Sequence, residues 1–166
     1  MRYLALAGAL AAFGCAPSRP AAHEGAAAVD PVGVVDAYIA AWNAHDAARA
    51  AGAFAENVEY YDASVGTPVV GRAAAQEQVI QAFLTAAPDC IWIRDTTPPV
   101  VGTDAIAFQW TFSGTNTGPW SDGTKATGKR FSFKGLTLIR LDGEKIVYQG
   151  DYYDAYGLYK QVGLAN

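Results

Sequence analysis

The pattern of apolar and polar residues divides the chain into a helical first part and an extended second part. In the first part, apolar residues recur three and four positions apart, which is the spacing of one face of an α-helix. This spacing predicts three helices: one that begins at Pro31, a short one over residues 47–54, and one that follows Gly71 and ends at Pro88. A short strand is expected over residues 58–61.

From Cys90 onward, apolar and polar residues alternate, which predicts half-buried antiparallel strands. Two long strands are expected over residues 106–112 and 131–141, and a third strand passes through Asp151. A short helix that ends near Gly163 is expected to close the chain. Helices followed by a run of strands are typical of an α+β fold, in which the helices pack on one side of a curved sheet.

Asp151 is an acid within an aromatic strand, so its face of the sheet decides its chemistry. A buried carboxylate is costly, and at such a position it is either solvent-facing or functional. Alternation along the strand places Asp151 on the less apolar face, which predicts exposure. Pairing near Thr137 on the neighbouring strand predicts burial, because Thr137 shares its face with Phe133 and Ile139. We favour burial of Asp151 in a cavity.

The composition limits the classes of function. The 166 residues fit one domain, and the formal net charge of −4 is spread along the chain without a cluster of Lys or Arg. A nucleic-acid surface is therefore not expected. The chain has two histidines, His23 and His45, and no cysteine cluster, so we expect no metal and no cofactor.

Residues 1–14 have the pattern of an export signal, because Arg2 precedes an apolar run that is too short to span a membrane. The end of this run, Gly14-Cys15, resembles a bacterial lipoprotein signal, although Ala12 and Phe13 depart from its usual residues. The resemblance implies cleavage before Cys15, acylation of its thiol, and anchoring in the bacterial cell envelope. An ordinary signal peptide that is cut nearby and a misassigned start codon are the alternatives.

The region between this signal and the first predicted helix is rich in Ala and Pro. Residues 15–29 are therefore expected to be a flexible tether, and residues 30–166 the folded domain. If Cys15 is acylated, Cys90 remains as a single thiol, and we interpret it as a small core residue.

Three groups of motifs occur in a characteristic order along residues 34–163. They are Tyr-Ile-Ala-Ala-Trp-Asn-Ala-His-Asp at 38–46 with Tyr61-Asp62, Gly-Thr-Asn-Thr-Gly at 114–118 with Thr-Gly-Lys-Arg-Phe at 127–131, and Gly-Asp-Tyr-Tyr-Asp at 150–154. In order and spacing they resemble the SnoaL-like polyketide cyclase family of the nuclear transport factor 2-like superfamily. The resemblance implies a cone-shaped fold, with three N-terminal helices packed on a strongly curved, mostly antiparallel sheet, a short C-terminal helix and an apolar cavity.

The resemblance also implies cofactor-free aldol ring closure, with Asp151 as the general acid/base. A carboxylate in an apolar pocket has a raised pKa, which suits proton transfer from carbon near neutral pH. Two departures weaken the analogy, since Thr137 and Asn116 stand where the family commonly has histidine. Thr137 can form hydrogen bonds but does not exchange protons at neutral pH.

The remaining candidates are expected to bind the substrate. Asp62 and Thr137 would orient it, and Asp62 is equally well interpreted as a turn residue. The other predicted contacts, for most of which core packing is the alternative, are Tyr38, Trp42, Trp110, Phe112 and Asn116. Arg94 could complete an Asp-Arg-Asp arrangement like that of limonene-epoxide hydrolases, but the motif of that branch is absent, and a surface strand position is favoured.

Two functions remain open from the sequence. The first is an exported cyclase or isomerase that acts on a small hydrophobic carbonyl compound. The second is a non-catalytic lipoprotein that binds a small hydrophobic molecule or mediates association, and export favours it because aromatic polyketide assembly is cytoplasmic. Leu136 and Leu138, on the outer face of the sheet, are compatible with a homodimer.

Overall fold

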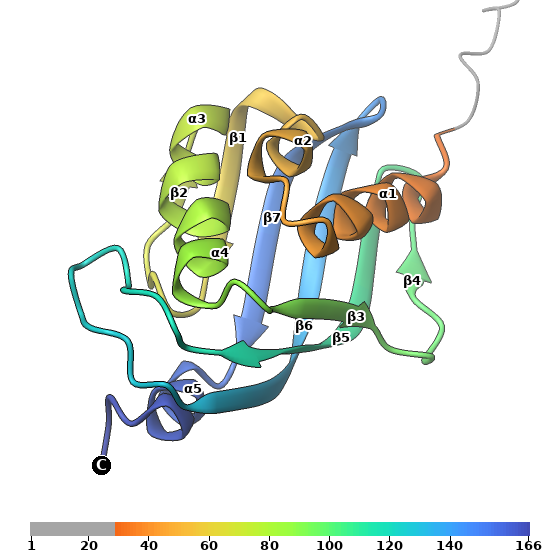
Figure 1. The fold of residues 1–166 in the computed structure, drawn as a ribbon. Coiled ribbons are helices and arrows are strands. Elements are labelled where there is room, and N and C mark those ends of the chain that lie inside the picture. The colour runs from red at the N-terminus through yellow and green to blue at the C-terminus, as the bar shows by residue number, and fades with distance from the viewer. Residues whose placement is uncertain (1–28) are drawn as a thin grey trace, which may run out of the picture.

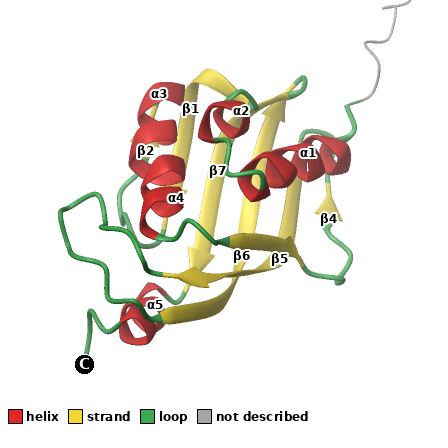
Figure 2. Ribbon diagram, viewed as in Figure 1, coloured by secondary structure: helices red, strands yellow, loops and turns green. Residues whose placement is uncertain are grey.

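In the computed structural model, helices cover one face of a strongly curved seven-stranded sheet (Figure 1, Figure 2). The structure describes residues 29–166. The predicted signal peptide, Cys15 and nearly all of the predicted tether therefore lie outside the described residues. Within residues 29–166, the expected α+β cone with a short C-terminal helix is confirmed.

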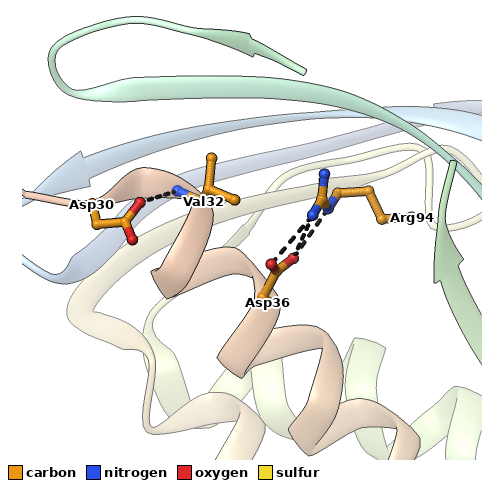
Figure 3. Close-up of polar contacts among 4 residues, drawn as sticks. All are labelled: Asp30, Val32, Asp36 and Arg94. Atoms are coloured by element: carbon orange, nitrogen blue, oxygen red, sulfur yellow. Dashed lines mark hydrogen bonds and ion pairs between the residues drawn. The ribbon is translucent and has the colours of Figure 1, made fainter. Parts of the chain in front are cut away.

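The first helix and the last helix form where their capping residues predict them. Helix α1 spans Pro31–Asn43, and the Asp30 carboxylate caps it by accepting a hydrogen bond from the Val32 amide at 3.1 Å (Figure 3). Helix α5 spans Ala155–Val162, with Asp154 as its N-cap. It ends at Gly163, whose left-handed backbone (φ 75°) favours glycine.

The second predicted helix is shorter than expected. Helix α2 spans Ala47–Ala51, is capped by Asp46 and ends at Gly52. Phe54, which the sequence pattern assigns to this helix, is instead the first residue of strand β1, Phe54–Asp62. The predicted strand over residues 58–61 is thus longer at its N-terminal end, because the helix stops at the glycine.

The third predicted helix is a composite of three segments. Helix α3 (Arg72–Ala75), a π-helical segment (Gln76–Gln81) and helix α4 (Ala82–Ala86) follow one another without a break. A π-helical turn adds a residue to an α-helix and is frequent at functional sites. The buried side chains of Val79 and Phe83 still face the sheet.

The sheet has the order β2-β1-β7-β6-β5-β3, with β4 paired to β5. Strands β1 and β7 are parallel and the other pairs are antiparallel. The two-residue strands β2 and β4 were not expected from the sequence pattern. The remaining strands are β2 Val69–Val70, β3 Ile91–Arg94, β4 Val100–Val101, β5 Ala105–Thr115, β6 Arg130–Asp142 and β7 Lys145–Tyr153.

A β-bulge in β7 determines which side chains of this strand face the helices. Leu141 of β6 pairs with Ile146, but the preceding residue, Arg140, pairs with Tyr148, so Val147 is an extra residue in β7. An extra residue reverses the alternation of side chains along the rest of the strand. Ile146 and Asp151 therefore both face inward and are buried.

This bulge resolves the conflict between the two predictions for Asp151. Alternation counted from Ile146 gives the wrong face, because the count does not include the bulge. The pairing of Asp151 opposite Thr137 is confirmed. On the other side of the sheet, Leu136 is 40% exposed, and Leu138 is half-buried.

Aromatic side chains from the helices and the sheet form most of the core. Tyr38 and Trp42 of α1 pack against Trp92 of β3, and Trp92 in turn contacts Trp110 of β5. No helix within residues 29–166 has the length and apolar character needed to cross a membrane.

Candidate acid/base site

A small cavity of about 30 Å³ lies between the helices and the inner face of the sheet. A water molecule needs about 10–15 Å³ of such space, so the cavity has room for about two or three water molecules. The side chains therefore occupy most of the region in which the resemblance implies an apolar cavity. The residues that line it are Trp42, Tyr60, Asp62, Phe83, Trp92, Trp110, Phe112, Phe133, Asp151 and Tyr153.

Three side chains hold the Asp151 carboxylate at the wall of this cavity. The Tyr60 hydroxyl donates to Oδ2 at 2.7 Å, and the Thr137 hydroxyl donates to Oδ1 at 2.5 Å. The Gln149 amide donates to both oxygens, at 3.0 and 3.3 Å. Asp151 is 5% exposed, so these donors replace much of the hydration that the carboxylate loses.

The position of Thr137 is fixed by the indole of Trp110. The Trp110 Nε1–H donates to the Thr137 hydroxyl oxygen at 2.7 Å. The indole lies over Gly135, where an added Cβ would approach the Trp110 ring to 2.3 Å. Thr137 is fully buried behind the carboxylate and does not line the cavity, so it contacts Asp151 and not the space where a substrate would bind.

Asp62 is both a turn residue and a cavity residue, so the two interpretations of the sequence are compatible. One of its oxygens, Oδ1, accepts hydrogen bonds from the amide and hydroxyl of Ser64, at 2.8 and 2.6 Å, and from the Tyr153 hydroxyl at 2.8 Å. Asp62 is 3% exposed, and in the parallel pairing of β1 with β7 it lies beside Asp151. The site therefore holds two buried carboxyl groups on adjacent strands.

Burial raises the pKa of both carboxyl groups. Burial raises the pKa of Asp151 to about 7, with a further contribution from the charge of Asp62, against the opposing effect of its three hydrogen-bond donors. Burial also raises the pKa of Asp62, whereas hydrogen bonds from Ser64 and Tyr153 lower it. Burial and the nearby Asp151 charge hold the pKa of the Tyr60 hydroxyl well above its usual value, so Tyr60 remains a donor.

Several buried donors near the cavity have no hydrogen-bond partner among the described residues. They include the indole Nε1–H of Trp42 and of Trp92, both of which line the cavity, and the hydroxyl of Tyr38. An unpaired buried donor costs about 1–3 kcal/mol, which a ligand oxygen would recover. Tyr38 itself does not line the cavity and packs against Phe54 and Trp92.

Asn116 lies away from the cavity, in contrast to the prediction that it contacts the substrate. Its amide nitrogen donates to the carbonyl oxygens of Ala86 and Gly118, and its amide oxygen accepts from the Thr127 amide. These bonds use both ends of a fully buried side chain. Asn116 therefore holds the base of the loop over residues 116–129 against the end of α4.

Arg94 is a surface residue, as the sequence analysis favoured. Its guanidinium pairs with both carboxylate oxygens of Asp36 on α1, at 3.0 and 3.2 Å (Figure 3). This pairing leaves no Asp-Arg-Asp arrangement with Asp62 and Asp151. His45 contacts the carbonyl oxygen of Cys90 at 2.8 Å, and Cys90 is a buried free thiol, so both are structural.

Several residues of the site were not identified as candidates from the sequence. Tyr60 and Gln149 contact Asp151, and Tyr153, Trp92 and Phe83 line the cavity. Tyr60 and Gln149 each lie two residues before a predicted acid on the same strand, and this spacing is the signal that would have identified them. No group of three His, Cys, Asp or Glu side chains in residues 29–166 is arranged to hold a metal ion.

Comparisons with known proteins identify the family. The model of the SnoaL-like polyketide cyclase family matches residues 32–162. No curated protein matches the chain.

Solved structures show the same fold. TsrD from Streptomyces laurentii is 22% identical, with a TM-score of 0.68 over 81% of this chain and 98% of that one. AclR from Streptomyces galilaeus is 21% identical (TM-score 0.67; 81% and 96% covered). A protein of ketosteroid isomerase-like fold from Catenulispora acidiphila DSM 44928 is 22% identical (TM-score 0.66; 78% and 92% covered). The chain belongs to the SnoaL-like polyketide cyclase family of the nuclear transport factor 2-like superfamily.

Proposed function

We propose that this protein is a cofactor-free acid/base enzyme of cyclase or isomerase type that acts on a small hydrophobic carbonyl compound. The observation that carries the proposal is Asp151, a buried carboxyl group at the cavity wall whose pKa is raised to about 7 by burial. At neutral pH such a group is present in both protonation states, as a general acid/base requires.

The proposed reaction uses Asp151 twice. The ionised carboxylate removes a proton from the carbon next to the substrate carbonyl, and the resulting enolate is the nucleophile. In a cyclase, the enolate carbon forms a bond to a second carbonyl carbon, and the protonated Asp151 then returns its proton to the new alkoxide oxygen. In an isomerase, the substrate has a C=C bond next to the carbon that loses the proton, and Asp151 returns the proton to the far carbon of the resulting dienolate.

The donors around the cavity support a carbonyl compound as the ligand. The Trp42 and Trp92 indole N–H groups have no partner among the described residues, and both side chains line the cavity. A carbonyl oxygen that becomes negatively charged in the transition state would accept hydrogen bonds from such donors. The aromatic walls, among them Phe112 and Phe133, favour an apolar ligand body.

The proposal can be tested without knowledge of the natural substrate. We would measure the exchange of the α-hydrogens of 2-tetralone for deuterium in D₂O by NMR, because 2-tetralone is a small hydrophobic ketone with acidic C–H bonds. The wild-type protein is expected to accelerate exchange, and Asp151→Asn to reduce the acceleration by about 100-fold or more. Asp104→Asn, at an exposed position, is the matched control. Equal exchange by the wild type and Asp151→Asn would contradict the proposal.

The second candidate function is non-catalytic binding of a small hydrophobic molecule. The presence of Thr137, which does not transfer protons at neutral pH, favours it. Native mass spectrometry of protein purified from its own host distinguishes the two functions. A retained, chemically unchanged ligand, together with no exchange of 2-tetralone, would favour the binding function.

We further propose that the protein is exported and anchored to the membrane of a bacterial cell envelope through a lipid on Cys15. The support is the signal-like pattern of residues 1–14 and the Gly14-Cys15 pair that follows it. We also propose a homodimer through the outer face of the sheet, because Ile93, Leu136 and Tyr152 are 57, 40 and 45% exposed there. Sedimentation of the purified domain tests the dimer.

A further inference from the structure

Phe83 lines both the acid/base cavity and a larger groove at the surface. This groove has a volume of about 510 Å³, within the range of small-molecule sites, whereas the cavity measures about 30 Å³. A ligand large enough to be a carbonyl substrate therefore fits the groove but not the cavity, and Phe83 is the residue that the two linings share.

The loop over residues 116–129 presents an aromatic ring to Phe83 at this boundary. The Trp120 ring packs edge-on against Phe83, with ring centroids 5.7 Å apart. The Trp120 amide bonds the carbonyl oxygen of Thr124 at 2.9 Å, which closes a tight turn at the loop tip. The Trp120 indole Nε1–H is buried and has no hydrogen-bond partner among residues 29–166.

The base of the loop is held firmly, so Trp120 has a defined position. Asn116 bonds the end of α4 and Thr127, as described above. Gly118 lies so close to α4 that an added Cβ would approach the Thr85 carbonyl oxygen to 1.9 Å. The contact of Trp120 with Phe83 therefore follows from the backbone path of the loop.

Much of the remaining lining of the groove is polar and acidic. The π-helical segment contributes Glu77 and Gln78, and the turn after β1 contributes Ser64, which also bonds Asp62. Tyr159 of α5 lines the groove and donates to the Ser64 carbonyl oxygen at 2.9 Å. Ser64 thus lines the groove and is hydrogen-bonded to Asp62, so it connects the groove to the two buried carboxyl groups.

The charge of the lining selects among ligands. Glu77 and Asp122 line the groove, and no Lys or Arg is among the described residues that do so. Anionic ligands are therefore repelled. Aromatic rings stack well on Trp and Phe, and the serine, threonine, amide and tyrosine groups of the lining bind hydroxyl groups.

We propose that this groove binds the non-reacting part of the substrate, an uncharged ring compound with hydroxyl groups, and that Phe83 and Trp120 form the gate between this part and the reacting carbonyl. The proposal rests on the proposed function, in that the cavity beyond Phe83 is the acid/base site. Trp120 and the groove set which molecules bind, and displacement of Phe83 admits the carbonyl group to Asp151.

The test uses 2-naphthol as an uncharged hydroxylated aromatic probe and 2-naphthoate as its anionic counterpart. The four tryptophans, Trp42, Trp92, Trp110 and Trp120, each give one indole N–H signal in a ¹H–¹⁵N NMR spectrum, and single Trp→Phe variants assign these signals. In the wild type, 2-naphthol is expected to shift the Trp120 signal with a dissociation constant at least about tenfold below that of 2-naphthoate.

Variants test the two rings separately. Trp120→Ala is expected to weaken 2-naphthol binding by about tenfold or more, since it removes the stacking surface. Tyr152→Ala, which removes an exposed aromatic ring on the outer face of the sheet, is the control and is expected to leave binding unchanged. In Phe83→Leu, which conserves apolar character, 2-naphthol should also shift the signals of Trp42 and Trp110, because the smaller side chain opens the cavity.

Specific outcomes overturn the proposal. A dissociation constant of Trp120→Ala for 2-naphthol within about twofold of the wild-type value would place the entrance elsewhere. So would signals of the cavity tryptophans that shift at lower 2-naphthol concentrations than the Trp120 signal. Equal affinity for 2-naphthol and 2-naphthoate would contradict the ligand class. If the Trp120→Ala variant does not fold, the backbone amide signals of Val65 and Thr124 in the wild type locate the probe, because both residues line the groove.

Failure of this inference and failure of the proposed function give different results. Asp151→Asn is expected to bind 2-naphthol as the wild type does, because Asp151 does not line the groove. Groove binding without 2-tetralone exchange would contradict only the acid/base function. Exchange of 2-tetralone that depends on Asp151, without binding of 2-naphthol in the groove, would contradict only the inference about the groove.

Discussion

Thr137 and Asp151 lie directly opposite each other on β6 and β7, and the Thr137 hydroxyl donates to Asp151 Oδ1 at 2.5 Å. The same hydroxyl oxygen accepts a hydrogen bond from the Trp110 indole, so its own proton is directed to the carboxylate. Thr137, at the position that commonly carries histidine in the family, fixes the Asp151 carboxylate in place. Thr137 is thus a positioning residue for the proposed reaction.

Replacement of Thr137 by valine tests this role, because valine has the same shape without the hydroxyl. The hydrogen bond from Thr137 lowers the pKa of Asp151, so Thr137→Val is expected to raise that pKa above about 7. A ¹³C NMR titration of the Asp151 carboxyl group measures the change. Thr111→Val, at a half-buried position on β5, is the control, and an unchanged pKa in Thr137→Val would contradict the role.

Replacement of Asp151 by asparagine is expected to change stability in a pH-dependent way. The pKa of Asp151 is raised in the folded state from 3.8 to about 7, so the folded protein holds this proton to higher pH than the unfolded chain. The stabilisation that comes from holding this proton on Asp151 is fully present below about pH 4 and is lost as the pH rises through about 7. At pH 8 the ionised carboxylate therefore destabilises the fold.

Asp151→Asn removes this ionisation and is expected to be more stable than the wild type at pH 8. The upper limit is about 4 kcal/mol, since a tenfold change in proton affinity corresponds to about 1.4 kcal/mol. Near pH 4 the gain should disappear. Urea denaturation at both pH values measures the free energy of unfolding, and a pH-independent difference would show that Asp151 has an ordinary pKa.

Replacement of Gly135 by alanine is expected to disturb the site through Trp110. The added Cβ would approach the Trp110 ring to 2.3 Å, so the indole must move away from Thr137. A cost of about 1–3 kcal/mol in unfolding free energy is expected, with a shift of the Trp110 indole N–H signal. Gly102→Ala, whose Cβ finds no neighbour closer than 3.6 Å, is the control.

Replacement of Arg94 by glutamine is expected to have little effect. The Asp36–Arg94 ion pair lies at the surface, with side chains 52 and 26% exposed, and such pairs contribute about 0–1 kcal/mol. Deuterium exchange of 2-tetralone by Arg94→Gln should equal that of the wild type. Loss of exchange in a folded variant would mean that Arg94 acts on the substrate.

Replacement of Cys15 by serine tests the proposed lipid anchor. The variant lacks the thiol that would be acylated, so it is expected to move from the membrane fraction to the soluble envelope fraction of the host. Immunoblots of the two fractions measure the distribution. An unchanged distribution would contradict anchoring through this residue.

The helices and long strands were predictable from the sequence because their signals are local. Asp30 and Asp46 cap α1 and α2 as their residue types favour, and the alternation in β5 and β6 matches the buried faces of these strands. The two-residue strands β2 and β4 have no such signal. They exist because the neighbouring strands β1 and β5 offer backbone partners.

The candidate site was predictable only in part, for two physical reasons. Trp42, Trp110 and Phe112 line the cavity on faces that the pattern of apolar residues identifies. Asp62 and Asp151 line it as well, but for Asp151 the alternation indicates the wrong face, and only the expected pairing with Thr137 places it inward. The hydrogen-bond partners of Asp151 depend on strand register and side-chain packing, which involve residues far apart in the chain. Asn116 was placed at the substrate because a motif does not show whether its amide groups are already bonded to the backbone.

The bulge at Val147 reconciles the length of β7 with an acid that faces inward. Ile146 and Asp151 are an odd number of positions apart, which would place them on opposite faces of a regular strand. The extra residue takes up one position, so both side chains reach the interior, opposite Leu141 and Thr137. Deletion of Val147 would therefore leave a regular strand with Asp151 still facing inward, whereas one further residue before Asp151 without a second bulge would turn the carboxylate to solvent with the Gly-Asp-Tyr-Tyr-Asp motif unchanged. A comparison of family members must count strand length and bulges as well as motif identity.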